Sequence, residues 1–190
     1  MKIVPIIDHY FFEDNIQNSE EVNKEIIEYL TKKKQNQKNN KYEIGSSKRE
    51  DLILSSEEYN KKPFINLIYL ILEKINKGSK KYAISSLWGM VQHPGQSCCY
   101  HDHDQYTQSP KPTNIGTVNN LSFVYYLNKN ENDGILKFPF SIYQNKIIYN
   151  FEGKKGDLLF FPSWLPHYVT LNESNEDRVL LSGNLICYET

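Results

Sequence analysis

Three of the five histidines, His101, His103 and His167, have the spacing of a metal site. His101 and His103 are two residues apart in the expected strand SCCYHDH, so both side chains leave the same face. His167 follows the apolar segment GDLLFFPSWLP and begins another expected strand, where it can supply a third ligand. Imidazole binds iron, zinc, copper or nickel, so the residue types alone do not choose the metal. Taken singly, the HxH pair and His167 are each more typical of ordinary surface or loop positions than of a metal site.

Arg178, eleven residues after His167, is a candidate for binding a carboxylate. The segment 172–177, NESNED, has the composition of a turn, so residues 167–171 and 178–184 are expected to form a hairpin. In that hairpin Arg178 lies about 10 Å along the partner strand. This separation suits a small dicarboxylic acid that binds the metal at one end and the guanidinium at the other. The alternative is a surface arginine paired with an acidic side chain of the turn.

These candidates lie in a part of the chain that is rich in short strands. After Lys80, β-rich runs alternate with turn sequences such as HPGQ, NKNENDG and EGKKG. A succession of such runs without an intervening helix indicates an antiparallel sandwich or barrel. We therefore predict an α+β, mainly β protein in which residues 81–190 form a double-stranded β-helix, a jelly-roll or cupin-like fold. We expect residues 1–80 to join them in one compact domain.

The first 80 residues have the pattern of supporting elements. IVPIID (3–8) is typical of a short strand. Apolar residues recur at helical spacing in 19–33 and in 63–77, which predicts two helices packed outside one sheet. Between them, the lysine- and asparagine-rich residues at about 35–48 are expected to form a polar, disordered loop.

Composition narrows the possible partners and locations. The 190 residues are 39% hydrophobic and 13% aromatic with a net charge of −1, which suits a globular protein and gives no reason to expect binding to nucleic acid or an anionic membrane. The longest apolar run, FINLIYLIL (64–72), is too short to span a bilayer, and the N-terminus does not have the pattern of a signal peptide. The cysteine pattern predicts no disulfide framework. We expect a cytoplasmic protein with a small-molecule or protein substrate.

Residues 88–184 resemble a known enzyme family. The matching pieces are LWGMVQHPGQS before the HDH pair, then LSFVYYLN, DGILKF and GKKGDLLFFPSWLPHYVTLNESNEDRVLLSGNL. They resemble the 2-oxoglutarate/iron(II) oxygenases found in phages and marine bacteria, a branch of the prolyl-hydroxylase-like group. The last piece is the most specific.

The resemblance implies a non-haem oxygenase, a hydroxylase that uses Fe(II), 2-oxoglutarate and O₂. It implies that the metal ligands are His101, His103 and His167, and that Arg178 forms the salt bridge to 2-oxoglutarate. The other implied cofactor-binding residues are Tyr126, Ser182 and Asn184. Aromatic candidates for the pocket wall, each more typical of an ordinary core position, are Trp88, Tyr126, Phe138, Phe160 and Trp164.

Two features depart from the wider superfamily. Its usual ligand motif is His-x-Asp/Glu…His, whereas here His103 stands at the second ligand position, as it often does in the branch that this sequence resembles. Asp104 could replace His103 as the ligand only if a bulge follows His103, and Asp102 points to the opposite face of an ideal strand. The second departure is the Pro- and Thr-rich segment 105–120, a candidate lid or substrate loop.

Two alternatives stay open on the sequence alone. Gly95 and Gly156 precede the histidines with spacings close to those of the two cupin motifs, and cupins also build three-histidine iron sites. A three-histidine dioxygenase that does not use 2-oxoglutarate is therefore the main alternative, although no Glu follows the HDH pair and Trp164 replaces a glycine of the second motif. The other alternative is a non-catalytic jelly-roll binding protein, which leaves the three histidines without a common role.

Overall fold

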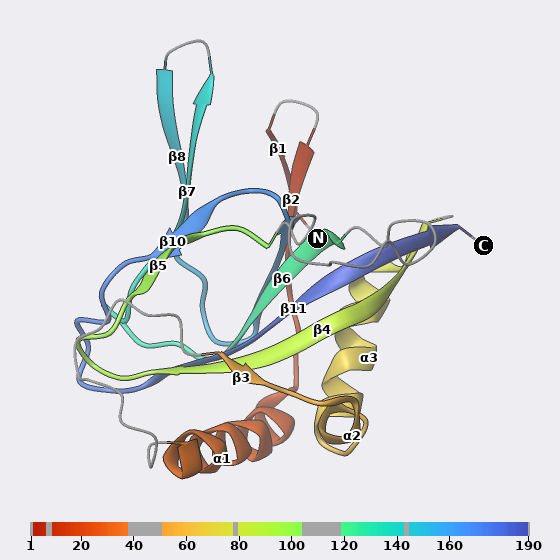
Figure 1. Ribbon diagram of the computed structural model, residues 1–190, viewed down its shortest axis with the longest axis vertical. Coiled ribbons are helices and arrows are strands. Elements are labelled where there is room, and N and C mark those ends of the chain that lie inside the picture. Colours follow the sequence, from red (N-terminus) through yellow and green to blue (C-terminus); the bar gives the residue numbers. More distant parts are fainter. Residues whose placement is uncertain are drawn as a thin grey trace, which may run out of the picture.

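Two antiparallel sheets lie face to face, and helices pack on the outer side of the larger sheet (Figure 1). The computed structural model describes residues 2–6, 9–37, 51–77, 80–103, 119–142 and 145–189. The arrangement is the predicted double-stranded β-helix, mainly β with N-terminal helices outside. Within the described ranges, no helix combines the length and apolar character needed to cross a membrane.

The larger sheet contains seven strands among the described residues, in the order β1-β2-β9-β6-β11-β4-β3. Their bounds are Lys2–Ile6 (β1), His9–Asn15 (β2), Asp157–Pro162 (β9), Asn119–Asn128 (β6), Arg178–Glu189 (β11), Lys80–Gln92 (β4) and Leu52–Ile53 (β3). β1 confirms the strand predicted near residues 3–8, whereas β2 was not predicted. The long strands β4 and β11 pair along their whole length, from Arg178 opposite Gln92 to Glu189 opposite Lys80.

The smaller sheet contains four strands within the described ranges, in the order β5-β10-β7-β8. Their bounds are Cys98–His101 (β5), His167–Val169 (β10), Leu136–Ile142 (β7) and Asn145–Phe151 (β8). His167 lies opposite His101 and Val169 lies opposite Cys98, so two residues of β5 face one residue of β10 in between. This is a β-bulge, and it leaves Cys99 and Tyr100 both exposed on the outer side.

The predicted hairpin between residues 167–171 and 178–184 is wrong. β10 pairs with β5 and β7 in the smaller sheet, whereas β11 pairs with β4 and β6 in the larger one. The turn at 172–177 therefore carries the chain from one sheet to the other. His167 and Arg178 consequently belong to opposite walls of the barrel instead of neighbouring strands.

The helices are α1 (Glu20–Gln37), the short α2 (Ser56–Tyr59) and α3 (Phe64–Ile75). α1 contacts β6 and β4, and α3 contacts β4, which confirms the two predicted outer helices (Figure 1). α1 packs so closely that a Cβ added to Gly89 of β4 would lie 2.3 Å from Leu30 Cδ2. The helix continues to Gln37, beyond the predicted start of the polar loop; the rest of that loop prediction, from 38 onward, lies outside the described residues.

The larger sheet separates two apolar clusters, because successive side chains of a strand point to opposite faces. On β9, Phe160 packs in the cluster beneath the helices, whereas Leu159 and Phe161 belong to the cluster between the sheets. The prediction that Phe160 forms part of the pocket wall is therefore wrong by one residue. Phe161 points into the barrel in its place, with its ring centroid 4.9 Å from that of His167.

Candidate metal centre

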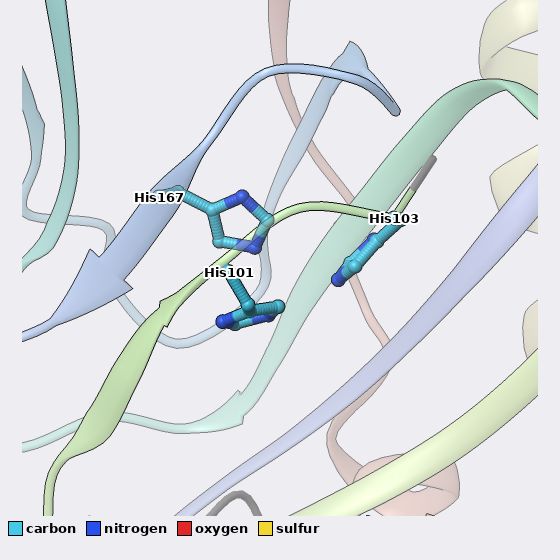
Figure 2. Close-up of side chains that lie close together, drawn as sticks. All are labelled: His101, His103 and His167. Atoms are coloured by element: carbon cyan, nitrogen blue, oxygen red, sulfur yellow. The ribbon is translucent and has the colours of Figure 1, made fainter. Parts of the chain in front are cut away.

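The three predicted histidines come together between the sheets (Figure 2). His101 ends β5, His103 lies two residues beyond it, and His167 begins β10 directly opposite His101. One ligand atom from each ring lies within 4.8 Å of the others. Two nitrogens that each lie about 2.1 Å from one ion are at most about 4.2 Å apart. Small rotations of the rings are therefore enough to bring all three nitrogens to one ion.

Backbone carbonyls orient two of the rings. His101 Nδ1 lies 2.7 Å from the carbonyl oxygen of Cys99, and His167 Nδ1 lies 2.9 Å from that of Leu165. A carbonyl can only accept, so each Nδ1 carries the proton and each neutral ring has its lone pair on Nε2. Metal-binding histidines commonly donate their other ring N–H to a carbonyl in this way.

A chain of side-chain hydrogen bonds orients the third ring. His103 Nδ1 lies 2.8 Å from Ser122 Oγ, and the Ser122 hydroxyl donates to Asn184 Oδ1 at 2.8 Å. Ser163 Oγ, at 3.0 Å, is a second acceptor within reach of this hydroxyl, whose single hydrogen goes to one of the two oxygens. Ser122 Oγ therefore accepts from His103, which again leaves the lone pair on Nε2. Asn184 Nδ2 donates in turn to Ser86 Oγ at 3.0 Å, so the chain runs from the ring across β6 and β11 to β4. The same tautomer in all three rings fits a shared metal ion.

A mostly apolar cavity adjoins the histidines. Its lining consists of Trp88, Met90, Cys98, His101, His103, Val124, Tyr126, Leu136, Phe161, His167, Val169, Leu180 and Ser182. Tyr126, Ser182 and Trp88 were predicted here. Phe138 lies behind His167 at a ring distance of 5.5 Å, whereas Trp164 is 45% exposed and does not line the cavity. Such walls exclude water from the groups that would react.

Arg178 is buried at the end of the same inner surface, with 1% of its surface exposed. Its Nε and Nη1 have no hydrogen-bond partner in the described part of the chain, and no ion pair of Arg178 is found there. Burial lowers the pKa of Arg178, and the neighbouring Tyr126 and Asp133 act in the opposite direction. The surface-arginine alternative is therefore wrong. A buried cation with unpartnered N–H groups fits an anionic ligand.

The distance along β11 from Arg178 to Ser182, which lines the cavity with the histidines, fits a short diacid. Arg178, Leu180 and Ser182 alternate along β11, and the last two line the cavity. Arg178 is four residues from Ser182, which is about 13 Å along a strand. The arginine side chain and a five-carbon diacid can together span this distance.

Tyr126 lies close to the guanidinium and lines the cavity. Burial raises the pKa of Tyr126 to about 12, and the positive charge of Arg178 opposes this rise. The phenol is therefore protonated at neutral pH. It can donate a hydrogen bond to an anion bound beside it.

One family model matches the sequence over residues 86–184, more than half of the chain, under the description "Putative 2OG-Fe(II) oxygenase". The matched segment includes the three histidines, Tyr126 and Arg178. The chain belongs to this family. The protein is thus an oxygenase, an oxidoreductase that uses Fe(II), 2-oxoglutarate and O₂, which confirms the activity and cofactors predicted above. The cupin and non-catalytic alternatives are excluded with it.

Three solved structures share the fold of this oxygenase. A Pseudomonas putida prolyl-4-hydroxylase matches with a TM-score of 0.62 and 14% identity over 94% of this chain and 93% of that chain. The viral collagen prolyl hydroxylase of Paramecium Bursaria Chlorella virus-1, solved with 2-oxoglutarate, matches with a TM-score of 0.59 and 16% identity over 92% and 94%. The α-ketoglutarate-dependent carbocyclase SnoK from nogalamycin biosynthesis matches with a TM-score of 0.61 and 12% identity over 94% and 81%. No curated protein matches the sequence.

Among the residues of the candidate site that were not predicted from the sequence, three lie next to the histidines or Arg178. Cys98 lines the cavity, with Sγ 3.8 Å from His101 Nδ1, and Ser122 orients His103. Gly134, at φ +102°, leaves the room that Arg178 needs, since an added Cβ would lie 3.1 Å from Nη1 and 2.6 Å from the carbonyl oxygen of Thr170. Only the turn sequence NDG signalled Gly134; Ser122 has no local signal in the sequence.

The predictions for the segment after His103 fall mostly outside the described residues. Asp102 is exposed, in agreement with its expected orientation away from the metal site. Asp104 and residues 105–118, the candidate lid, lie beyond the described ranges, and Asn119 and Asn120 begin β6.

Proposed function

We propose that His101, His103 and His167 hold the Fe(II) of this oxygenase, and that Arg178 binds the distal carboxylate of 2-oxoglutarate. In this proposal the enzyme hydroxylates a small-molecule or protein substrate. The observation that carries the assignment is the shared tautomer of the three rings. Each Nδ1 donates to an oxygen of the protein, so the three Nε2 lone pairs remain to bind one ion.

His103 is the second ligand in this assignment. Its ring is buried, and its hydrogen bond to Ser122 prevents Nδ1 from competing as a ligand atom. Asn184 does not line the cavity and acts here through Ser122, as a residue that positions the ligand instead of touching the co-substrate. Three neutral imidazoles leave the charge of a divalent ion uncompensated by the protein. The site therefore favours anionic partners, as the dicarboxylate co-substrate is.

The residues around the histidines prepare the pocket for this chemistry. Bound Fe(II), with 2-oxoglutarate and O₂, supplies the oxidising power that no side chain has. Met90, Val124, Leu136 and Leu180 keep water away from the reacting groups. Tyr126 and Arg178 offer donors to the end of 2-oxoglutarate that faces away from the metal, and Ser182 offers a hydroxyl between them and the histidines.

Calorimetric titration of the anaerobic, iron-loaded protein with 2-oxoglutarate tests the proposal. Arg178→Ala should weaken 2-oxoglutarate binding by about 2–5 kcal/mol, because it removes the charged partner of a buried carboxylate. Iron affinity should change little, and Arg178→Lys should restore part of the loss, because lysine keeps the charge but lacks the planar fork. Binding that ignores Arg178 would remove this residue from the proposal.

A further inference from the structure

Gln92 is a buried side chain beside Arg178 that the site as described does not use. It is the last residue of β4 and lies directly opposite Arg178, the first residue of β11. Only 5% of its surface is exposed. Trp88 and Met90, four and two residues earlier on β4, line the cavity, so Gln92 continues the same inward row.

Gln92 and Arg178 have complementary atoms that remain without partners. Gln92 Oε1, an acceptor, and Arg178 Nε and Nη1, which are donors, are buried and have no hydrogen-bond partner among the described residues. The two side chains stand opposite each other on neighbouring strands, yet no hydrogen bond joins them. Leaving such atoms unpaired costs free energy. A carboxylate between the two side chains would pair with the guanidinium and, after a half-turn of the amide, with Gln92 Nε2.

The backbone around Gln92 is held in place by the loop that leads to Arg178. The buried Asn172 donates from Nδ2 to the carbonyl oxygens of Gln92, at 3.0 Å, and of Glu176, at 2.9 Å. Asn172 therefore ties the end of β4 to the chain just before β11. These hydrogen bonds hold the backbone at Gln92 and the backbone just before Arg178 at a fixed separation.

We infer that Gln92 binds the distal carboxylate of 2-oxoglutarate together with Arg178, and so selects a dicarboxylic over a monocarboxylic 2-oxo acid. A half-turn of the amide presents Nε2 in place of Oε1, so Gln92 can donate to one carboxylate oxygen while Arg178 donates to the other. The inference rests on the proposed role of Arg178.

The neutral amide suits this role better than a carboxylate would. A glutamate at this position would pair with Arg178 and compete with the ligand for the guanidinium. An amide adds hydrogen-bonding groups and leaves the positive charge to the co-substrate. Gln92→Glu should therefore weaken 2-oxoglutarate binding at least as much as removal of the amide.

The test compares two 2-oxo acids of equal length, 2-oxoglutarate and 2-oxopentanoate, by calorimetry on the anaerobic iron-loaded protein. Gln92→Leu should weaken 2-oxoglutarate binding about 10- to 100-fold, the effect of losing a hydrogen bond to a charged group. Binding of 2-oxopentanoate, which lacks the distal carboxylate, should change less than about threefold, and so should iron binding. The ratio of the dissociation constants for the two acids therefore becomes smaller. General damage to the fold would weaken the binding of both acids and leave this ratio unchanged.

Asn23→Leu is the matched control. Asn23 is also a buried amide with an unpartnered atom, Nδ2, but it lies on α1, on the helix-covered side of the sheet, where its Oδ1 accepts from Tyr125. Its replacement should leave the preference between the acids unchanged. If Gln92→Leu does not fold, Gln92→Met, whose side chain has a similar length, serves in the same comparison.

The outcomes separate this inference from the proposed function. Loss of 2-oxoglutarate binding in Arg178→Ala, together with parental binding in the Gln92 variant, overturns the inference alone. An equal loss for both acids in the Gln92 variant also overturns it, because the distal carboxylate is then not what the residue recognises. If the parent shows no 2-oxoglutarate binding, or Arg178→Ala binds like the parent, both the proposed site and the inference fail.

Discussion

The two faces of the larger sheet use the same strands for different purposes. Along β11, Val179 and Leu181 point outward and pack beneath the helices, whereas Arg178 and Ser182 lie on the inner face, where Ser182 lines the cavity. β6 alternates in the same way: outward Phe123, Tyr125 and Leu127 interleave with inward Ser122, Val124 and Tyr126. The outer face is joined mainly by apolar packing, and the inner face combines apolar walls with oriented polar groups.

Adjacent residues of one strand therefore differ in role: the outward residue contributes mainly to stability, and the inward residue lies on the side of the candidate site. The outward side chains contribute by removing apolar surface from water, which does not depend on any ligand. Among the inward ones, Ser122 is fully hydrogen-bonded within the protein, whereas Arg178 and Gln92 keep atoms that a ligand would satisfy. Substitutions at outward positions should therefore change mainly the free energy of unfolding. Substitutions at neighbouring inward positions should change mainly the affinity for iron or 2-oxoglutarate.

The largest expected effect is the loss of metal from the inner face. His167→Ala removes one of the three proposed ligands, and we expect iron affinity to fall by more than about 100-fold, beyond the 10- to 100-fold typical of residues that only orient a ligand. The thermal midpoint of the metal-free protein should change much less. Metal titration with a competing chelator measures this, and an unchanged iron affinity would show that His167 is not a ligand.

Leu181→Ala should damage the outer face instead. Leu181 is fully buried beneath the helices, so the substitution leaves a cavity and should lower the free energy of unfolding by about 2–5 kcal/mol. Denaturant unfolding gives this value. Below the unfolding transition, iron and 2-oxoglutarate affinities should match the parent; a selective loss of either ligand would mean that the two faces are not independent.

Ser122→Ala tests whether a polar residue of the inner face affects iron affinity more than an apolar residue of the same face does. The hydroxyl that orients His103 is lost, and we expect iron affinity to fall about 10- to 100-fold while the fold is retained. Chelator competition again provides the measurement. Val124→Ala, two residues further along the same inward row, removes apolar wall without touching this hydrogen bond and serves as the control. A weaker effect of Ser122→Ala than of Val124→Ala on iron affinity would contradict the orienting role.

The smallest effect at neutral pH concerns the Tyr126 phenol. Its pKa is raised from 10.0 to about 12 in the folded state, so the unfolded state loses its proton first as the pH rises. The stability linked to this group is present below pH 10 and is lost between about pH 10 and 12, by up to about 1.4 kcal/mol for each pH unit. Tyr126→Phe should make unfolding free energy less steeply dependent on pH in that range. An identical slope in parent and variant would mean that the phenol titrates equally in both states.

Local patterns in the sequence predicted most of the fold. The change from helical to alternating periodicity after Lys80 predicted the two outer helices and the β-rich barrel. It could not show that the chain crosses between sheets at 172–177, because a turn composition is the same whether the flanking strands pair or part. An error of one residue in a strand also assigns a side chain to the wrong face of the sheet. Phe160 packs beneath the helices, whereas its neighbour Phe161 lines the cavity.

The candidate site was predictable where residue type was informative. Histidines two apart and an isolated arginine can be recognised from chemistry and spacing. Gln92, Ser122 and Gly134 acquire their positions only through long-range pairing, as in the register that puts Gln92 opposite Arg178. No local rule distinguishes such residues from ordinary strand or turn positions.

The bulge in β5 gives this strand one residue more than the pairing with β10 requires. The extra residue puts Cys99 and Tyr100 together on the outside, while Cys98 and His101 both remain inward. Deleting Tyr100 would restore ordinary alternation and still leave these two inward, so iron affinity should survive the deletion. A one-residue deletion at this point can therefore change the outer surface of the enzyme without disturbing the proposed metal ligands.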